Sequence, residues 1–234
     1  MKKIILCILI ILCYFNSVYA QISIAREPYS YRNKINNSDI DVKILPNLNY
    51  SLLDAEDQKD YKNGVPPRFG FPHDVDLNLE NSGTWFKLPN GDKLWLLRIE
   101  CPNAISINLL YNKFWLPEDA GLHIYSEDKR SIIGMFSNRN NKGSRESNRG
   151  FATGLIFSSV IILEYYEPRK VEGEGIISIA KVVHGYREIG VENFGDSGDC
   201  QVNINCSPEG NNWQNETPMI IFFNTNEHDY KALM

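Results

Sequence analysis

The stretch TWFKLPNGDKLWLLRIEC, residues 84–101, decides the fold class. Its centre, Pro89-Asn90-Gly91-Asp92, has the composition of a turn, because Asn-Gly readily adopts the positive φ angles of tight hairpins. The flanking residues 84–88 and 93–101 are therefore predicted to be the two strands of a β-hairpin. One face of the second strand is wholly apolar and consists of Trp95, Leu97, Ile99 and Cys101. We expect this face to lie in the core, where each fully buried large side chain contributes roughly 1.5–3 kcal/mol.

Further short strands are predicted after the hairpin, separated by clusters of Asn, Gly, Pro and Ser. They are expected at residues 104–110, 121–126, 132–137, 154–166 and 175–183. Many short strands without helical periodicity between them indicate an all-β protein, here an antiparallel β-sandwich of jelly-roll type. This predicted sandwich spans residues 65–187.

The segments on either side of the predicted sandwich differ from it in composition. Residues 21–64 are polar and are expected to form an extended lead-in with one short helix at 51–61, where Ser51 and Asp54 make a capping pattern. Residues 188–234 are interpreted as a linker followed by an irregular tail.

Residues 1–20 have the three parts of a secretory signal peptide. Lys2 and Lys3 form the positive region, residues 4–14 are apolar, and Val18-Tyr19-Ala20 is a small-residue cleavage site. The apolar part is shorter than the roughly 20 residues of a membrane-spanning helix. We therefore expect a secreted, periplasmic or cell-surface protein that has no membrane attachment after cleavage.

Composition excludes one class of partner. Acidic residues outnumber basic ones by 29 to 24, which gives a net charge of −5, and the basic residues form no block. Binding to nucleic acid requires clustered Lys and Arg to neutralise phosphates, so nucleic acid is not an expected partner. No cofactor is expected either. With 43% hydrophobic residues, the chain can bury the core of one ordinary domain.

Cys200 and Cys206 lie on the same face of a predicted strand with Val202 and Ile204. Six residues of extended chain place their Cα atoms roughly 20 Å apart, whereas a disulfide allows roughly 7 Å at most. The two cysteines therefore cannot pair with each other while the strand persists. Only Cys101 remains in the exported part of the chain, so at least one thiol has no partner, and we expect a following domain to be absent.

Gly195-Asp196-Ser197-Gly198 has the form of the segment around the nucleophile of trypsin-like serine proteases. A serine nucleophile requires a histidine base, an acid that orients it and donors for the oxyanion. None of the four histidines has the Ala-His-Cys context of that base, and Asp199-Cys200 departs from the protease pattern. We interpret the segment as a turn in a linker and assign no catalytic residue.

Two groups of side chains that carry oxygen ligands have both a functional and a structural interpretation. The first alternates with apolar residues and comprises Asp74, Asp76, Asn78 and Glu80. Such oxygen ligands suit calcium, but alternation alone produces a polar strand face, which is the preferred interpretation. The second comprises Glu164, Glu167, Glu172 and Glu174. A glycosidase needs two carboxyl groups across a cleft, and the sequence favours solvated charges instead. Trp85, Trp95 and Trp115 are expected to fill the core.

Eight short segments of the predicted sandwich belong together: Gly83–Trp85, Leu88–Asp92, Leu96–Ile99, Ser106–Leu109, Leu116–Glu118, Ile124-Tyr125, Glu164–Pro168 and Val183–Arg187. Taken together, they resemble the pro-region of secreted lysyl-endopeptidase-like serine proteases of bacteria. The resemblance spans about residues 64–216 and continues into segments similar to the start of the mature protease. These are Phe194–Cys200, Cys206–Gly210 and Trp213-Gln214.

The resemblance implies a pro-domain that assists folding and latency of a cognate serine protease domain, with processing in the region of Arg187, Phe194 and Gly195. It also implies that Cys200 and Cys206 pair within that protease domain. After Glu216 the sequence departs from the family, and the segments that carry its histidine, aspartate and serine do not follow. The expectation is therefore a pro-domain with a truncated protease stub. The alternatives are a secreted β-sandwich module that binds carbohydrate or a surface protein, and a full-length product that is a serine endopeptidase.

Overall fold

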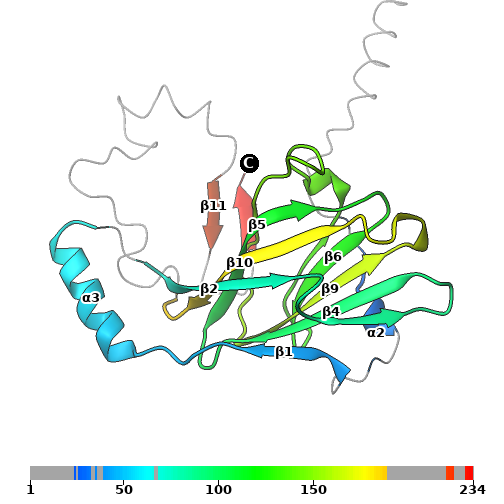
Figure 1. Ribbon diagram of the computed structural model, residues 1–234. Helices are drawn as coiled ribbons and strands as arrows, with labels where there is room; N and C mark the ends of the chain where they lie inside the picture. Colours follow the sequence, from blue (N-terminus) through cyan, green and yellow to red (C-terminus); the bar gives the residue numbers. More distant parts are fainter. Residues whose placement is uncertain are drawn as a thin grey trace, which may run out of the picture.

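The computed structural model describes residues 24, 26–32, 35, 39–65 and 68–188, together with the backbone of 220–223 and 230–233 (Figure 1). Two β-sheets form the body of the molecule. The first has the strand order β1-β4-β9-β6-β7, and β3 pairs with β4 beside this path. Its strands are β1 (Asp41–Ile44), β3 (Thr84–Lys87), β4 (Lys93–Glu100), β6 (Gly121–Ser126), β7 (Ile132–Phe136) and β9 (Val160–Glu167).

The second sheet has the order β2-β10-β5-β8 and is antiparallel throughout. Its strands are β2 (Gly70–Asn78), β5 (Ser106–Trp115), β8 (Phe151–Ala152) and β10 (Ile176–Gly185). The main core contains buried side chains from both sheets, such as Leu97 and Leu163 of the first and Leu109 and Ile179 of the second. The predicted all-β class is confirmed. The first sheet is mixed rather than antiparallel, because β1 runs parallel to β4.

The hairpin predicted at residues 84–101 is confirmed, and its second strand is the centre of the fold. Trp85 lies opposite Trp95 in the β3–β4 pairing, and the turn is closed by a 2.8 Å bond from Leu88 N to Asp92 O. Gly91 has φ +88°, as the Asn-Gly pair requires. The expected inward face of β4 lies wholly in the main core. Cys101 ends this face as a buried free thiol, and burial raises its pKa to about 12.

The opposite face of the first sheet is also buried. Leu94 and Leu96 belong to a second apolar cluster, which is covered by Tyr29, Tyr31 and Ile40. These covering residues belong to the N-terminal strap, by which we mean the described residues between 24 and 40, including helix α2 (Tyr29–Arg32). The expected lead-in therefore packs along the sheet, and β1 continues it as an edge strand.

Strands β1 and β3 share one edge of β4, each pairing with one half of it. Asp41 joins the two, because its Oδ2 accepts from Gly83 N at 2.8 Å and its N donates to Thr84 Oγ1 at 2.9 Å. Gly83 has φ +73° and lies directly against the ring of Trp95. The indole Nε1 of Trp95 donates to Ser82 O at 2.7 Å. The turn before β3 is thus built tightly around a buried indole.

Helix α3 (Tyr50–Lys62) lies at one end of the sandwich (Figure 1). It matches the helix predicted at 51–61, but the capping interpretation is wrong. Asn49 is the N-cap, and its side chain accepts from Leu52 N at 3.2 Å. Two short 3-10 helices, η2 (Asn138–Asn140) and η3 (Arg169–Val171), lie in loops.

Other boundaries differ from the prediction. β5 continues to Trp115, and β9 begins only at Val160, because the Ser158 side chain bonds to the backbone of Val160 and turns the chain there. A two-stranded hairpin of β11 (Ile220–Phe223) and β12 (Tyr230–Leu233) replaces part of the expected irregular tail. Among the described residues, no helix is both long and apolar enough to span a bilayer.

Candidate functional site

A buried carboxylate, that of Glu164, lies beneath the N-terminal strap. It is on the outward face of β9, between Leu96 of β4 and His123 of β6, and is 1% exposed. Its oxygens accept hydrogen bonds from the backbone N–H groups of Tyr29 and Ser30 and from the Tyr125 hydroxyl at 3.2 Å. A buried charge is tolerated when donors satisfy its oxygens in this way. Glu164 thus fixes the start of α2 to the sheet.

His123 holds the strap at a second point. It is 4% exposed, and its Nε2 lies 2.6 Å from the carbonyl oxygen of Arg26. Because a carbonyl only accepts, Nε2 carries the proton and donates. Burial lowers the pKa of His123, so the neutral ring is favoured. The strap is also joined to the edge of β7, where Ile24 and Met135 exchange backbone bonds of 3.0 and 3.1 Å.

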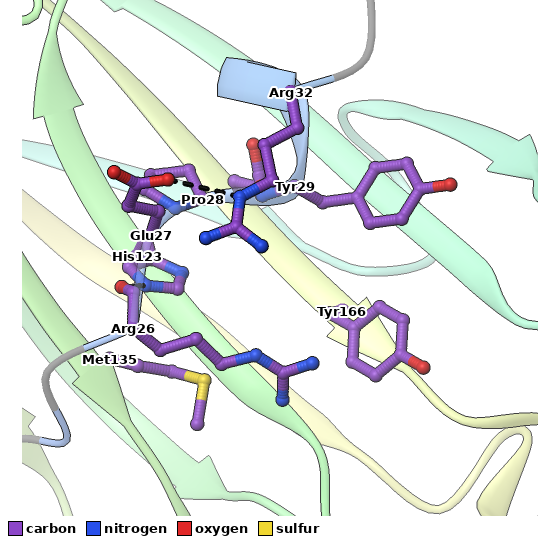
Figure 2. Close-up of a pocket in the computed structure, with 9 residues that line it drawn as sticks. Arg26, Glu27, Pro28, Tyr29, Arg32, His123, Met135 and Tyr166 are labelled. Carbon is purple, nitrogen blue, oxygen red and sulfur yellow. Dashed lines mark hydrogen bonds and ion pairs between the residues drawn. The ribbon is translucent and has the colours of Figure 1, made fainter.

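A hollow of about 80 Å³ opens between the strap and the sheet (Figure 2). The guanidinium of Arg26 lies 5.7 Å from the centre of the Tyr166 ring, and Arg32 Nε lies 3.0 Å from Glu27. Three titratable side chains line its sheet side. His123 and Glu164 are engaged by the strap, and the Tyr166 hydroxyl donates to Asp92. The acid and the base of this region, Glu164 and His123, therefore serve to attach the strap to the sheet.

A second cluster of charges joins α3 to the end of β10, and we call it the Asp57 clasp. Asp57, whose side chain is 6% exposed, accepts hydrogen bonds from Arg68 Nε at 2.6 Å and Tyr186 Oη at 2.7 Å. It also forms an ion pair with Arg187, whose Nη2 lies 3.0 Å from its Oδ2. The Asp57 carboxylate raises the pKa of Arg68, after a larger contribution from Glu56. The pKa of Tyr186 is raised to about 12, mainly by burial and then by Asp57. Arg187, for which the resemblance implied a place in a processing region, is therefore anchored to α3 through Asp57.

Two histidines lie side by side near the same end of the sandwich. His73 of β2 and His184 of β10 have ring centroids 5.8 Å apart, and Tyr50 Oη of α3 lies 3.4 Å from His184 Nε2. His184 is fully buried, and its Nδ1 has no hydrogen-bond partner within the part of the chain that the structure describes. Burial, with a smaller contribution from His73, lowers the pKa of His184 to about 4.

Stability is expected to fall in acid because of this pair. In the unfolded chain His184 is protonated below its ordinary pKa of about 6.5, whereas in the native protein it is protonated only below about pH 4. Above pH 6.5 the neutral His184 does not lower the free energy of unfolding. Between pH 6.5 and about pH 4 this free energy falls by no more than about 1.4 kcal/mol per pH unit. His73, whose pKa is also lowered by burial, acts in the same direction. Urea unfolding at steps between pH 4 and 7 should show a flatter curve for His184→Leu, and equal slopes would contradict this explanation.

Of the other sequence candidates, Cys200, Cys206, Phe194, Gly195 and Ser197 lie outside the described residues. Asp74 forms an ion pair with Lys181 on the outer face of β2. Asn78 Oδ1 accepts from the backbone of Glu80 and Asn81, which makes that end of the acidic row a turn. Within the described part, no three metal-ligating side chains come together.

Three of the four glutamates considered for a glycosidase, Glu164, Glu167 and Glu172, lie in different surroundings. Glu164 lies on the outward face of β9, and Glu167 lies on the inward face, where it accepts from Tyr165. Glu172 pairs with Lys93 at the surface. The tryptophan prediction was correct for Trp95, which is fully buried, and wrong for Trp85, which is 36% exposed and donates from Nε1 to Leu79 O at 3.0 Å.

The sequence did not identify Asp57 or Glu164 as the central residues of these clusters. Asp57 and Tyr186 are 129 positions apart, and Tyr29 and Glu164 are 135 apart, so no local pattern links them. The protein is therefore a two-sheet β-sandwich. Its N-terminal strap is bonded to one sheet face, and the Asp57 clasp joins α3 to the end of β10. No protein-family model matches the chain, and no solved structure matches it.

Proposed function

We propose that this chain is the secreted pro-domain of a lysyl-endopeptidase-like serine protease, which assists the folding of a protease domain and keeps it latent. The observation that supports this most is the clasp at the end of β10. It holds Tyr186 and Arg187 to α3 at the residue where the sandwich ends and the linker begins. A pro-domain needs such a fixed exit, because the orientation of the following domain depends on it.

The remaining architecture supports the same function. The strap and α3 cover one sheet face and one end of the sandwich, so the module buries its own core without a partner. Its buried acid and base, Glu164 and His123, are engaged in holding the strap. These features suit a scaffold that binds and templates another domain.

Refolding a lysyl-endopeptidase catalytic domain in the presence of the full chain is expected to test this function. The recovered activity on Lys substrates should rise, and the refolded enzyme should be inhibited until the pro-domain is cleaved. The chain alone should not hydrolyse Lys or Arg substrates. A chain carrying Gly83→Ala, which destabilises the sandwich, serves as the control and should assist less. Turnover by the chain itself, abolished by Ser197→Ala, would instead identify it as a serine endopeptidase.

The rival function, a module that binds carbohydrate or a surface protein, would be supported by a platform of exposed rings on one sheet face. The exposed aromatic side chains of the described part are Tyr50, Tyr61, Trp85 and Phe157. They come from α3, β3 and the loop before β9, so they are spread over separate elements. The pro-domain therefore remains the function that we propose.

A further inference from the structure

We infer that the Arg187–Glu188 bond is a masked processing site, which a protease specific for basic residues hydrolyses only after α3 releases Arg187 from Asp57. The biological role of this site rests on the function proposed above, since it concerns the release of a protease domain. The masking itself is a property of the sandwich and is tested without that domain.

The linker offers a protease that is specific for basic residues only one bond, the one after Arg187. No Lys or Arg follows Arg187 until Lys231. The alternative processing positions, Phe194 and Gly195, lie in a stretch without basic residues. A trypsin-like enzyme that separates the sandwich from the C-terminal part of the chain therefore has only the bond after Arg187, whereas an enzyme restricted to lysine has no bond to cleave before Lys231.

The structure holds this arginine by both its side chain and its backbone. Its Nη2 lies 3.0 Å from Asp57 Oδ2, and its guanidinium lies 5.7 Å from the centre of the Tyr186 ring. Its backbone N–H donates to Phe69 O at 3.2 Å, and the N–H of Tyr186 donates to the same oxygen at 3.0 Å. Glu188, on the other side of the bond, is exposed. The Arg187–Glu188 bond is thus at the surface, but Arg187, the residue that the protease must bind, is held by Asp57 and Phe69 O.

Hydrolysis requires these contacts to break. A protease of this specificity binds the arginine in a pocket with its own carboxylate, and it binds the flanking residues as extended chain. Asp57 competes directly for the guanidinium, and the two bonds to Phe69 O oppose the extension. Cleavage then adds one water across the Arg187–Glu188 amide, which leaves a carboxylate on Arg187 and a new amino terminus on Glu188. The rate is expected to follow the population of the locally opened state.

Limited proteolysis of the full chain with trypsin tests the masking. Mass spectrometry measures the initial rate at which the new terminus at Glu188 appears, and the rate is divided by that for a synthetic peptide of residues 183–194. This peptide corrects for the effect of Glu188 on trypsin. The bonds after the exposed Lys142 and Arg149 provide an internal reference. In the native chain we expect cleavage after Arg187 to be at least about tenfold slower than in the peptide.

Asp57→Asn is the decisive variant, because it keeps the shape of the side chain and removes its charge. It should accelerate cleavage after Arg187 at least about tenfold while the two loop bonds keep their rates. Asp60→Asn, on the same helix and without a side-chain bond among the described contacts, is the matched control and should behave as the native chain. Tyr186→Phe, which removes one donor to Asp57, should give a smaller acceleration.

Two results would overturn the inference. The first is native cleavage at the rate of the peptide, which needs no variant and so stands even if Asp57→Asn fails to fold. The second is equal rates for Asp57→Asn and Asp60→Asn in folded protein. Neither result bears on the refolding assay, so the masked site and the pro-domain function can fail separately.

Discussion

Replacing Gly83 by alanine is expected to lower the free energy of unfolding by roughly 3–5 kcal/mol. A Cβ on Gly83 would lie 2.3 Å from two atoms of the Trp95 ring, and this indole is fully buried and bonded to Ser82 O. It therefore has no space into which it can move. The φ of +73° adds left-handed strain of about 1–2 kcal/mol for a residue other than glycine. Thermal and urea unfolding should show the loss, with a melting temperature lower by roughly 10 °C or more.

Gly173→Ala separates the two contributions. Gly173 has φ +77°, yet nothing lies within 4 Å of the position of its Cβ. This variant should therefore show only the strain, about 1–2 kcal/mol. If both variants lose the same stability, the contact with Trp95 is not the cause.

Replacing Glu164 by alanine is expected to detach the N-terminal strap and to cost about 3 kcal/mol or more. The substitution leaves the N–H groups of Tyr29 and Ser30 without their acceptor, and it removes one partner of the Tyr125 hydroxyl. Each unsatisfied buried donor costs roughly 1–3 kcal/mol. Release of the strap relieves part of this cost but exposes Leu94 and Leu96 to water. Hydrogen exchange should show faster exchange at Tyr29 and Ser30, and urea unfolding should show the lower stability.

Tyr125→Phe is the matched control for Glu164→Ala, because it leaves the carboxylate and its two backbone donors in place. It removes the hydroxyl that donates to Glu164 and that also bonds to Ser30 Oγ at 2.8 Å. It should cost about 1 kcal/mol and leave both strap amides protected. Native exchange rates at Tyr29 and Ser30 in Glu164→Ala would show that the strap is held by its apolar contacts instead.

Local chemistry explains the part of the fold that the sequence predicts. The hairpin follows from Asn90-Gly91 and from strict alternation in β4. Helix α3 was predicted at nearly its observed bounds, but from a capping pattern at Ser51 and Asp54 that the structure does not form. The burial of Leu94 and Leu96 was not predictable in this way, because it depends on a strap about 60 residues away along the chain. The exposure of Trp85 was not predicted either, although its cause is local: Leu79 O, six residues earlier in the chain, accepts from its Nε1 at the surface.

The two clusters were missed for a related reason. Glu164 belongs to a run of glutamates and tyrosines that looks like a solvated surface, and Asp57 belongs to an acidic helix. In both cases the carboxylate is buried because donors from distant segments meet it. Only Arg187 was singled out by sequence, through the resemblance to protease pro-regions, and its anchoring to α3 had no local signal.

The buried thiol of Cys101 has a practical consequence. Only the thiolate reacts with alkylating agents or disulfides, and a pKa near 12 leaves almost none at neutral pH. In the intact sandwich this sulfur should not react when the chain is exposed to an oxidant. The rate at which Cys101 is alkylated should therefore report how often the core opens. Peptide mapping can measure this rate in the unsubstituted protein.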